Sequence, residues 1–156
     1  LQPLMPIGRA ASNLDGIIPT NIQYRKLIYN IIKLTKGDIT VEWGDPIDHL
    51  IRYSEKKLSL NMCSIRANGD ITVSPYIPLI VGNIRKHTLK EYWENGLNSI
   101  WDTEVVRFLA TRIKSINDMN KMFIEYPSLY MGNEIFLDLF EKNLNDVSLL
   151  DNYKTK

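Results

Sequence analysis

The hydrophobic pattern near the N-terminus has the spacing of an amphipathic helix. Between residues 22 and 36, apolar side chains recur every three or four positions. Thr20 or Asn21 precedes this segment as a suitable N-cap, and Gly37 follows it as a stop. The pattern predicts a helix that rests on a core by one face.

Two short runs around this helix have sequences typical of strands. Residues 4–7 are apolar, and residues 39–43 alternate β-branched with polar side chains. Asp45 and Pro46 then supply an N-cap and a first-turn proline for a helix to about residue 57. Repeated strand–helix steps predict the last units of an α/β barrel or part of an open sheet, and periodicity alone leaves both alternatives open.

The middle of the chain changes to β-rich sequence. Residues 59–76 form two β-prone runs around Asn68-Gly69, which predicts a hairpin with a type I′ turn. A short apolar stretch, residues 79–84, is interrupted by Gly82. Thr88 and Glu91 then have the spacing of a capping box, so a helix should start at Thr88.

The last third has one clear helical pattern and several weaker ones. Residues 103–115 predict a helix with one apolar face, with Asp102 as a cap; that face is formed by Val105, Val106, Leu109 and Ile113. Residues 116–132 show no clean period and are expected to be mostly loop, while residues 133–143 predict a further helix. The tail after Asp146 is expected to fray.

Composition narrows the class of protein. The 156 residues are 44% hydrophobic and 24% charged with a net charge of +1, which suits one globular domain and gives no field that would attract nucleic acid or anionic lipid. No apolar run approaches the roughly 20 residues of a membrane span, and no signal-peptide pattern opens the chain, so we expect a cytoplasmic protein. Cys63 is the only cysteine; with His49 and His87 it forms no zinc-binding set.

A motif in the central region resembles the SPASM and twitch domains of radical S-adenosylmethionine (SAM) enzymes. The segment from Cys63 crosses the Asn-Gly turn to Pro75-Tyr76, continues through Gly82-Asn83-Ile84 and ends in Leu89-Lys-Glu-Tyr-Trp93. Upstream, Pro3-Leu-Met-Pro-Ile-Gly-Arg-Ala10 resembles the end of the catalytic partial barrel of the same enzymes. The two parts occur in the family's order and together cover about residues 1–110.

The resemblance implies an α/β or α+β fold in two parts. Residues 1–58 would be the last strand–helix units of a partial (β/α) barrel. Residues 59–156 would be a SPASM- or twitch-like β-hairpin with covering helices. The chain opens in apolar sequence without a start methionine, as expected of a piece cut from a larger protein.

The cysteines that the family's chemistry requires are missing from this chain. Radical SAM catalysis needs a Cys-x3-Cys-x2-Cys loop to hold an iron–sulfur cluster, and auxiliary clusters need several further thiolates. Tyr76 stands where the family has its second cysteine, and Cys63 is the one remaining cluster-ligand position. We therefore expect no catalytic residue, metal or cofactor in this chain, with the 4Fe–4S cluster and SAM bound by an N-terminal barrel of the parent enzyme.

Candidate binding residues follow partly from the resemblance and partly from residue type. Arg9, in the loop after the barrel strand, would contact the SAM pocket, or else form a surface salt bridge. Tyr76, Tyr126 and Tyr130, with nearby methionines, would line a groove for a peptide, the alternative being core packing. Cys63 is expected to be a buried thiol.

These observations lead to two hypotheses about function. In the first, the chain is the C-terminal part of a radical SAM maturase of peptides or proteins, where it closes the barrel and recognises substrate without being catalytic alone. In the second, it is an independent peptide- or protein-binding module without redox chemistry. The expected partners are the N-terminal barrel and a peptide or protein substrate, and neither nucleic acid nor membrane.

Overall fold

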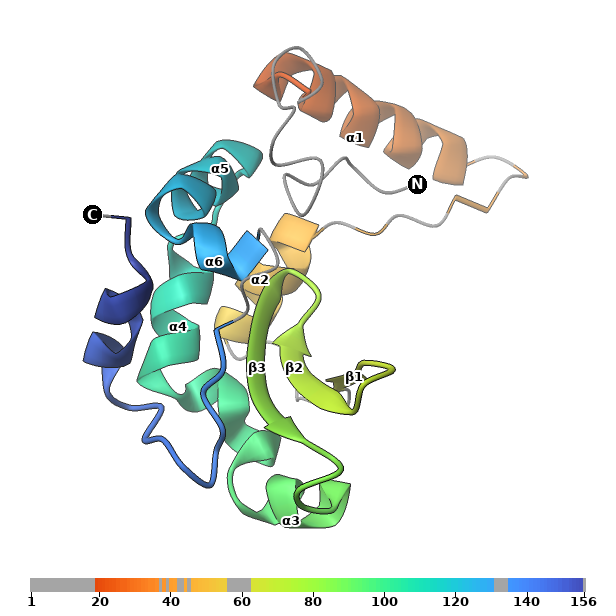
Figure 1. The fold of residues 1–156 in the computed structure, drawn as a ribbon. Coiled ribbons are helices and arrows are strands. Elements are labelled where there is room, and N and C mark those ends of the chain that lie inside the picture. The colour runs from red at the N-terminus through yellow and green to blue at the C-terminus, as the bar shows by residue number, and fades with distance from the viewer. Residues whose placement is uncertain are drawn as a thin grey trace.

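The computed structural model has an α+β fold, in which one small antiparallel sheet is surrounded by helices (Figure 1). It describes residues 19–36, 38, 40–41, 44, 46–55, 63–130 and 135–155. The predicted strand 4–7 and the boundary at residue 58 lie outside these ranges, as does most of the predicted strand 39–43. Thr40 and Val41, which are described, belong to no strand.

Two helices come from the N-terminal part of the chain. Helix α1, Asn21–Thr35, begins with a capping box in which Thr20 accepts from the Gln23 amide and the Gln23 side chain accepts from the Thr20 amide. Helix α2 spans Pro46–Ser54 and packs against a later helix, α4. Both helices were predicted from the sequence, although α2 ends about three residues earlier than expected.

Helix α1 differs from its prediction in how it packs. Among its residues Ile31 is buried, whereas Ile22, Tyr29, Ile32 and Leu34 are 46–68% exposed. In Figure 1, α1 lies at one edge of the molecule, above the sheet. Leu27 and Ile28 are half-buried beside Ile31, so the predicted apolar face of α1 is partly covered.

The sheet consists of β1, Ser64–Ile65, β2, Asp70–Ser74, and β3, Ile77–Asn83, in the order β1–β2–β3. Both strand pairs are antiparallel. All five residues of β2 are buried, so this strand is covered on both faces. Strand β3 was not predicted as a strand, because its nearly continuous apolar run lacks the alternation of a half-buried strand.

The predicted hairpin between β1 and β2 is confirmed, but its turn is not of type I′. The Gly69 amide donates to the Arg66 carbonyl, and the Arg66 amide donates to the Asp70 carbonyl. These bonds close a three-residue loop in which Gly69, with φ of 92°, takes the left-handed position after the turn. The loop is one residue longer than Asn-Gly alone suggests.

Helix α3, Leu89–Glu94, follows the sheet and starts at the predicted Thr88 capping box. A 3₁₀ helix, η2, spans Leu97–Asp102 and leads into α4, Glu104–Thr111. The predicted apolar face is confirmed for Val105, Val106 and Leu109 of α4, which are buried; the helix ends at Thr111, four residues earlier than predicted, and Ile113 is buried just beyond its end. The N-cap of α4 is Thr103 and not Asp102.

The C-terminal third corrects three predictions. Residues expected to be loop form α5, Ile116–Glu125, and α6, Pro127–Tyr130. The helix expected over 133–143 is wrong, because the chain from Ile135 is extended and Phe136 forms a parallel bridge with Ile80 of β3. The tail does not fray: residues Val147–Tyr153 form a 3₁₀ helix, η3, with Leu150 fully buried.

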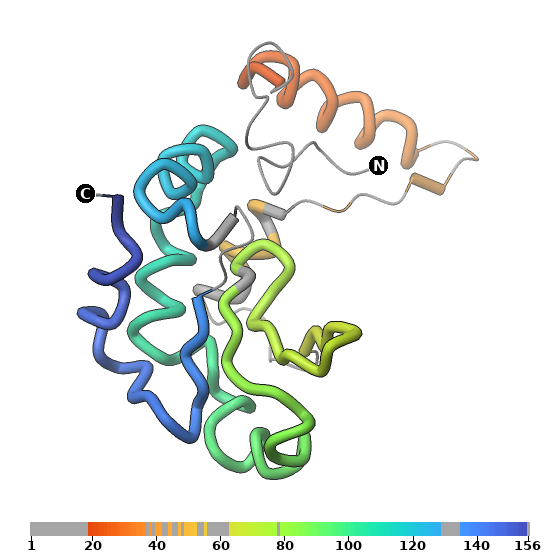
Figure 2. Tube along the Cα trace, in the orientation of Figure 1, coloured from red at the N-terminus to blue at the C-terminus, as the bar shows by residue number. Residues whose placement is uncertain are grey.

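The core joins the sheet with helices α2, α3, η2, α4, α5 and η3. Buried apolar side chains from β2, β3, η2, α4, α5 and the C-terminal tail form one cluster. Figure 2 shows the C-terminal segment passing beside β3 and then returning along α4. None of the described helices is both long enough and apolar enough to span a bilayer.

Candidate functional site

Gly82 and Tyr92 form the centre of the unit that carries the sequence motif. A Cβ atom built on Gly82 would lie 2.3 Å from Cε1 of Tyr92, so only glycine leaves room for this ring. The fully buried Tyr92 hydroxyl accepts a 3.0 Å hydrogen bond from the Asn83 amide and donates to Asp138 over 3.1 Å. The motif therefore fixes α3 against β3.

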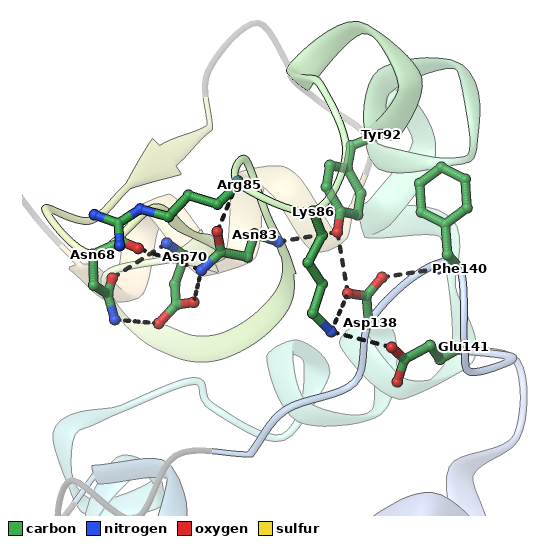
Figure 3. A network of polar contacts seen from close by, with 9 residues as sticks. All are labelled: Asn68, Asp70, Asn83, Arg85, Lys86, Tyr92, Asp138, Phe140 and Glu141. Atoms are coloured by element: carbon green, nitrogen blue, oxygen red, sulfur yellow. Dashed lines mark hydrogen bonds and ion pairs between the residues drawn. The ribbon is translucent and has the colours of Figure 1, made fainter.

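Asp70 and Asn83 connect this unit to the hairpin (Figure 3). The buried Asp70 carboxylate accepts from the side-chain amides of Asn68 at 2.6 Å and Asn83 at 2.7 Å. The Asn83 side-chain oxygen in turn accepts from the Arg85 amide at 2.8 Å. These bonds hold the β1–β2 loop against the end of β3.

A second carboxylate lies on the other side of Tyr92. Asp138 is 1% exposed and accepts from the Phe140 amide, while Lys86 approaches it to 3.6 Å and pairs with Glu141 at 3.1 Å. Burial raises the pKa of Tyr92, and the hydrogen bond to Asp138 acts in the same direction. The polar groups of this network bond to one another. The motif unit therefore stabilises the fold around Tyr92.

The end of the sheet that carries Tyr76 gathers several predicted residues. Ser64 pairs with Thr72, so Cys63 lies at the end of the hairpin where β2 turns into β3 at Tyr76. Ser74 Oγ lies 3.3 Å from His49 Nε2 and accepts from the Tyr76 amide. The His49 and Tyr76 rings meet edge to face at 5.2 Å. Ser74 is buried, so this end of the sheet is a packed junction with α2.

The predicted peptide-binding tyrosines do not share one exposed face. Tyr76 is half-buried on the core, and Tyr126 is fully buried within it, together with Met119 and Met122. Core packing, the alternative interpretation, therefore fits Tyr126. Tyr130 ends α6, but its side chain lies outside the described atoms. Arg9 lies outside the described residues and stays a prediction.

Cys63 is half-buried and packs against the core, as a free thiol. Cys63 is the one thiol in the sequence, and a single thiolate is too few ligands for the auxiliary iron–sulfur cluster that the resemblance implies. Within the described part of the chain, no group of three or more His, Cys, Asp or Glu residues is arranged to hold a metal ion.

A pocket of about 430 Å³ lies between α1, α2 and the start of α5. We call it the α1–α2 pocket. Its apolar wall consists of Tyr24 from α1, Ile47 and Ile51 from α2, and Ile116 from α5. Its size is in the range of sites that take small ligands or a few side chains. Pro19, Asn21 and Ser115 add polar and backbone surface at its rim.

Two of the described residues that line the α1–α2 pocket are charged, and both are positive. Arg25 on α1 and Lys114, just before α5, are exposed side chains. Within the described ranges neither side chain forms an ion pair. The arrangement can bind a negative group beside an apolar one.

The nearest carboxylate of α5 is already engaged. Asp118 accepts from Ser115 Oγ at 2.8 Å and from the Lys114 amide at 3.3 Å, and it pairs with Lys121 at 3.3 Å. Burial alone would raise the pKa of Asp118, but the bonds from Ser115, Lys121 and Lys114 lower it. Asp118 is therefore held ionised by its own helix terminus.

Arg25 and Lys114 were not among the residues that the sequence singled out. They lie far apart in the chain, and only the tertiary arrangement brings them to one pocket. One signal was present: residues 21–35 contain Arg25, Lys26 and Lys33 and no acidic residue. A basic amphipathic helix of this kind indicates an acidic partner.

Comparisons of the chain with protein-family models, with curated proteins and with solved structures found no match.

Proposed function

We propose that this chain is the C-terminal part of a radical SAM enzyme that modifies peptides or proteins. It closes the mouth of the catalytic barrel and holds the substrate there. The 4Fe–4S cluster and SAM belong to an N-terminal barrel, and the chain alone is not catalytic.

The observation that carries this proposal is the packing of the motif residues in space. The residues quoted for the resemblance come from β1 to α3, and they form one unit in which Gly82 admits the Tyr92 ring and Asn83 binds Asp70. Two positions of the resemblance, Gly82 and Asn83, thus contribute directly to the packing of this unit.

The α1–α2 pocket supports a role in recognition. Its lining combines residues from the part proposed as barrel remnant, such as Arg25 and Ile47, with residues such as Ile116 from the SPASM-like part. Substrate held between the two parts would lie at their junction. Exposed apolar side chains of α1, among them Ile22 and Tyr29, supply surface for the remainder of the barrel.

The second candidate is an independent peptide-binding module. The α1–α2 pocket favours it in one respect, because a concave surface with an apolar wall and two cations can bind a peptide without a barrel. This candidate requires no barrel partner and no SAM.

The gene distinguishes the two candidates. We expect the reading frame upstream of the Leu1 codon to encode Cys-x3-Cys-x2-Cys, and the longer protein, produced without oxygen, to bind iron and to consume SAM under reducing conditions. A start codon directly before Leu1, or a longer protein that binds neither iron nor SAM, would overturn the first candidate and leave the second.

A further inference from the structure

The α1–α2 pocket has the chemistry of a site for an acidic group next to an apolar one. Its wall is aliphatic and aromatic, from Tyr24, Ile47, Ile51 and Ile116, and the charged residues of its lining are Arg25 and Lys114. An apolar surface excludes water from a neighbouring ion pair and so strengthens it. A ligand that offered both features would satisfy both parts of the lining.

Among the described residues, no carboxylate forms an ion pair with the side chain of Arg25 or Lys114. Asp118 is bound by Ser115, Lys121 and the Lys114 amide, and the described residues that line the pocket include no carboxylate. A second cavity of about 200 Å³ adjoins at Lys114 and contains Glu55. Arg25 should therefore contribute more to the selection of an acidic ligand than Lys114.

The shape of the site distinguishes a peptide from a membrane. The pocket is a concavity between helices, and its apolar residues lie within it, where a bilayer surface does not reach. Nucleic acid fits poorly, because the whole chain carries a net charge of only +1. A peptide side chain of a few carbon atoms with a terminal carboxylate matches both the size and the charge.

We infer that the α1–α2 pocket binds a peptide segment in which an acidic side chain lies next to an apolar one. The acidic group pairs with Arg25 and Lys114 while the apolar side chain packs on Ile51 and Ile116. This inference rests on the proposed role of the chain in substrate recognition, and it applies to either candidate function.

Fluorescence anisotropy with two labelled, C-terminally amidated hexapeptides tests the inference on the 156-residue chain. The probes are Gly-Leu-Glu-Gly-Leu-Glu and its counterpart with glutamine in place of glutamate. We expect the acidic peptide to bind about tenfold more tightly, with the preference falling as salt is raised, since the cations are exposed. Equal binding of the two peptides, or none, would overturn the inference.

Matched variants locate the binding. Arg25→Gln should weaken the acidic peptide about tenfold and Lys114→Gln about threefold, as expected for charge-assisted pairs at a partly exposed site. Lys33→Gln removes a cation from the same helix outside the pocket and should change nothing. Because these side chains are exposed, urea unfolding should be unaltered. An equal loss of affinity in all three variants would show that the peptide responds only to the overall charge of the protein, and would contradict the inference.

A charge swap gives the sharpest test. The double variant R25E/K114E should lose the acidic peptide and gain a lysine counterpart, Gly-Leu-Lys-Gly-Leu-Lys. Binding to phosphatidylserine vesicles, with no selectivity between the peptides, would favour a lipid surface and overturn the inference. The proposed function is tested separately: a longer enzyme that consumes SAM and modifies its peptide equally well with Arg25→Gln would retain the function and refute this site.

Discussion

At the scale of single residues, Gly82 and Tyr92 determine how α3 meets the sheet. The ring of Tyr92 occupies the space in which any other residue at position 82 would place its Cβ. The Tyr92 hydroxyl then bridges the Asn83 amide and Asp138, so one side chain links β3, α3 and the C-terminal segment. Because Gly82 has no side chain, the Tyr92 ring fits beside it and the Tyr92 hydroxyl can form both hydrogen bonds.

We expect Gly82→Ala to destabilise the protein by about 2 kcal/mol or more, because the new methyl group must displace a buried ring in a packed core. Urea unfolding measures the change. Gly44→Ala is the control, since a Cβ at Gly44 meets nothing within 4 Å, and it should be nearly neutral. Equal stability of the two variants would show that Tyr92 does not lie over Gly82.

The ionisation of Tyr92 gives a prediction in alkaline solution. Burial raises its pKa above the ordinary value of 10.0, so the folded protein keeps a proton that the unfolded chain releases. Stability from this group is complete below pH 10 and is lost as the pH rises further. Tyr126, whose pKa is also raised by burial, contributes with the same sign.

The free energy of unfolding should therefore fall above about pH 10, and the slope should be smaller for Tyr92→Phe. At neutral pH the same variant should lose about 1–3 kcal/mol, because Asp138 and the Asn83 amide each lose a buried partner. Urea titrations at several pH values measure both effects. A slope unchanged from the parent protein would contradict the raised pKa of Tyr92.

At the scale of elements, helices α1 and α3 share the same kind of start. Thr20 with Gln23, and Thr88 with Glu91, each form a complete capping box. Each helix buries one side chain, and the two differ in how that side chain is held. Tyr92 of α3 is fully buried and hydrogen-bonded to β3 and to the C-terminal segment, although Leu89 and Trp93 are 39% and 37% exposed. Helix α1 buries Ile31, while its other exposed apolar side chains are 46–68% exposed. Identical caps should therefore have different consequences for the whole protein.

Thr88→Ala should lower the global free energy of unfolding by about 1 kcal/mol, because α3 is part of the cooperative core. Thr20→Ala should instead increase local fraying of α1 with a much smaller change in global stability. Urea unfolding and amide hydrogen exchange separate these outcomes. A larger global loss for Thr20→Ala than for Thr88→Ala would place α1, and not α3, in the cooperative core.

The elements with local signals could be predicted from the sequence. Capping residues indicated where α1 and α3 begin. The spacing of Val105 and Leu109 predicted α4, and Asn68-Gly69 predicted the hairpin. The turn type was missed because an Asn-Gly pair fits both a two-residue turn and the end of a three-residue loop. Helix α5 was not predicted because its Asn and Asp residues obscure the helical spacing of its apolar residues. That spacing is present in Ile116, Met119 and Met122, which the helix buries.

Other features depend on contacts between distant parts of the chain. Phe136 is extended because Ile135 and Leu137 exchange hydrogen bonds with Ile80, and no local propensity reveals that partner. The α1–α2 pocket has the same origin, since its cations Arg25 and Lys114 come from separate segments. Tertiary pairing overrides local pattern in both cases.

At the scale of the whole molecule, α1 is less integrated into the core than α4. Its exposed Ile22, Tyr29 and Ile32 contrast with α4, where four residues are buried. Figure 1 shows α1 at the edge, while α4 lies between the sheet and the C-terminal tail. Fewer buried contacts mean a smaller free energy for local opening.

Amide hydrogen exchange should therefore be fast in α1 and slow in α4 and β2, with α1 opening independently of global unfolding. Addition of the acidic hexapeptide should slow exchange in α1, because the α1–α2 pocket includes residues of this helix. Exchange in α1 as slow as in α4, without ligand, would show that the helix is held by more than its buried contacts.

The parallel pairing of Ile80 with Phe136 has a consequence for the order of folding. The three strands of the hairpin region can meet by closing short loops, but the 135–139 segment reaches β3 only after a long intervening stretch, with α3 to α6, has been gathered. Closing a longer loop costs more chain entropy, and such contacts form late. During synthesis, β3 would thus keep one edge uncovered until residues 135–139 leave the ribosome, and that edge is where a chain stalled before these residues would be most prone to pair with another.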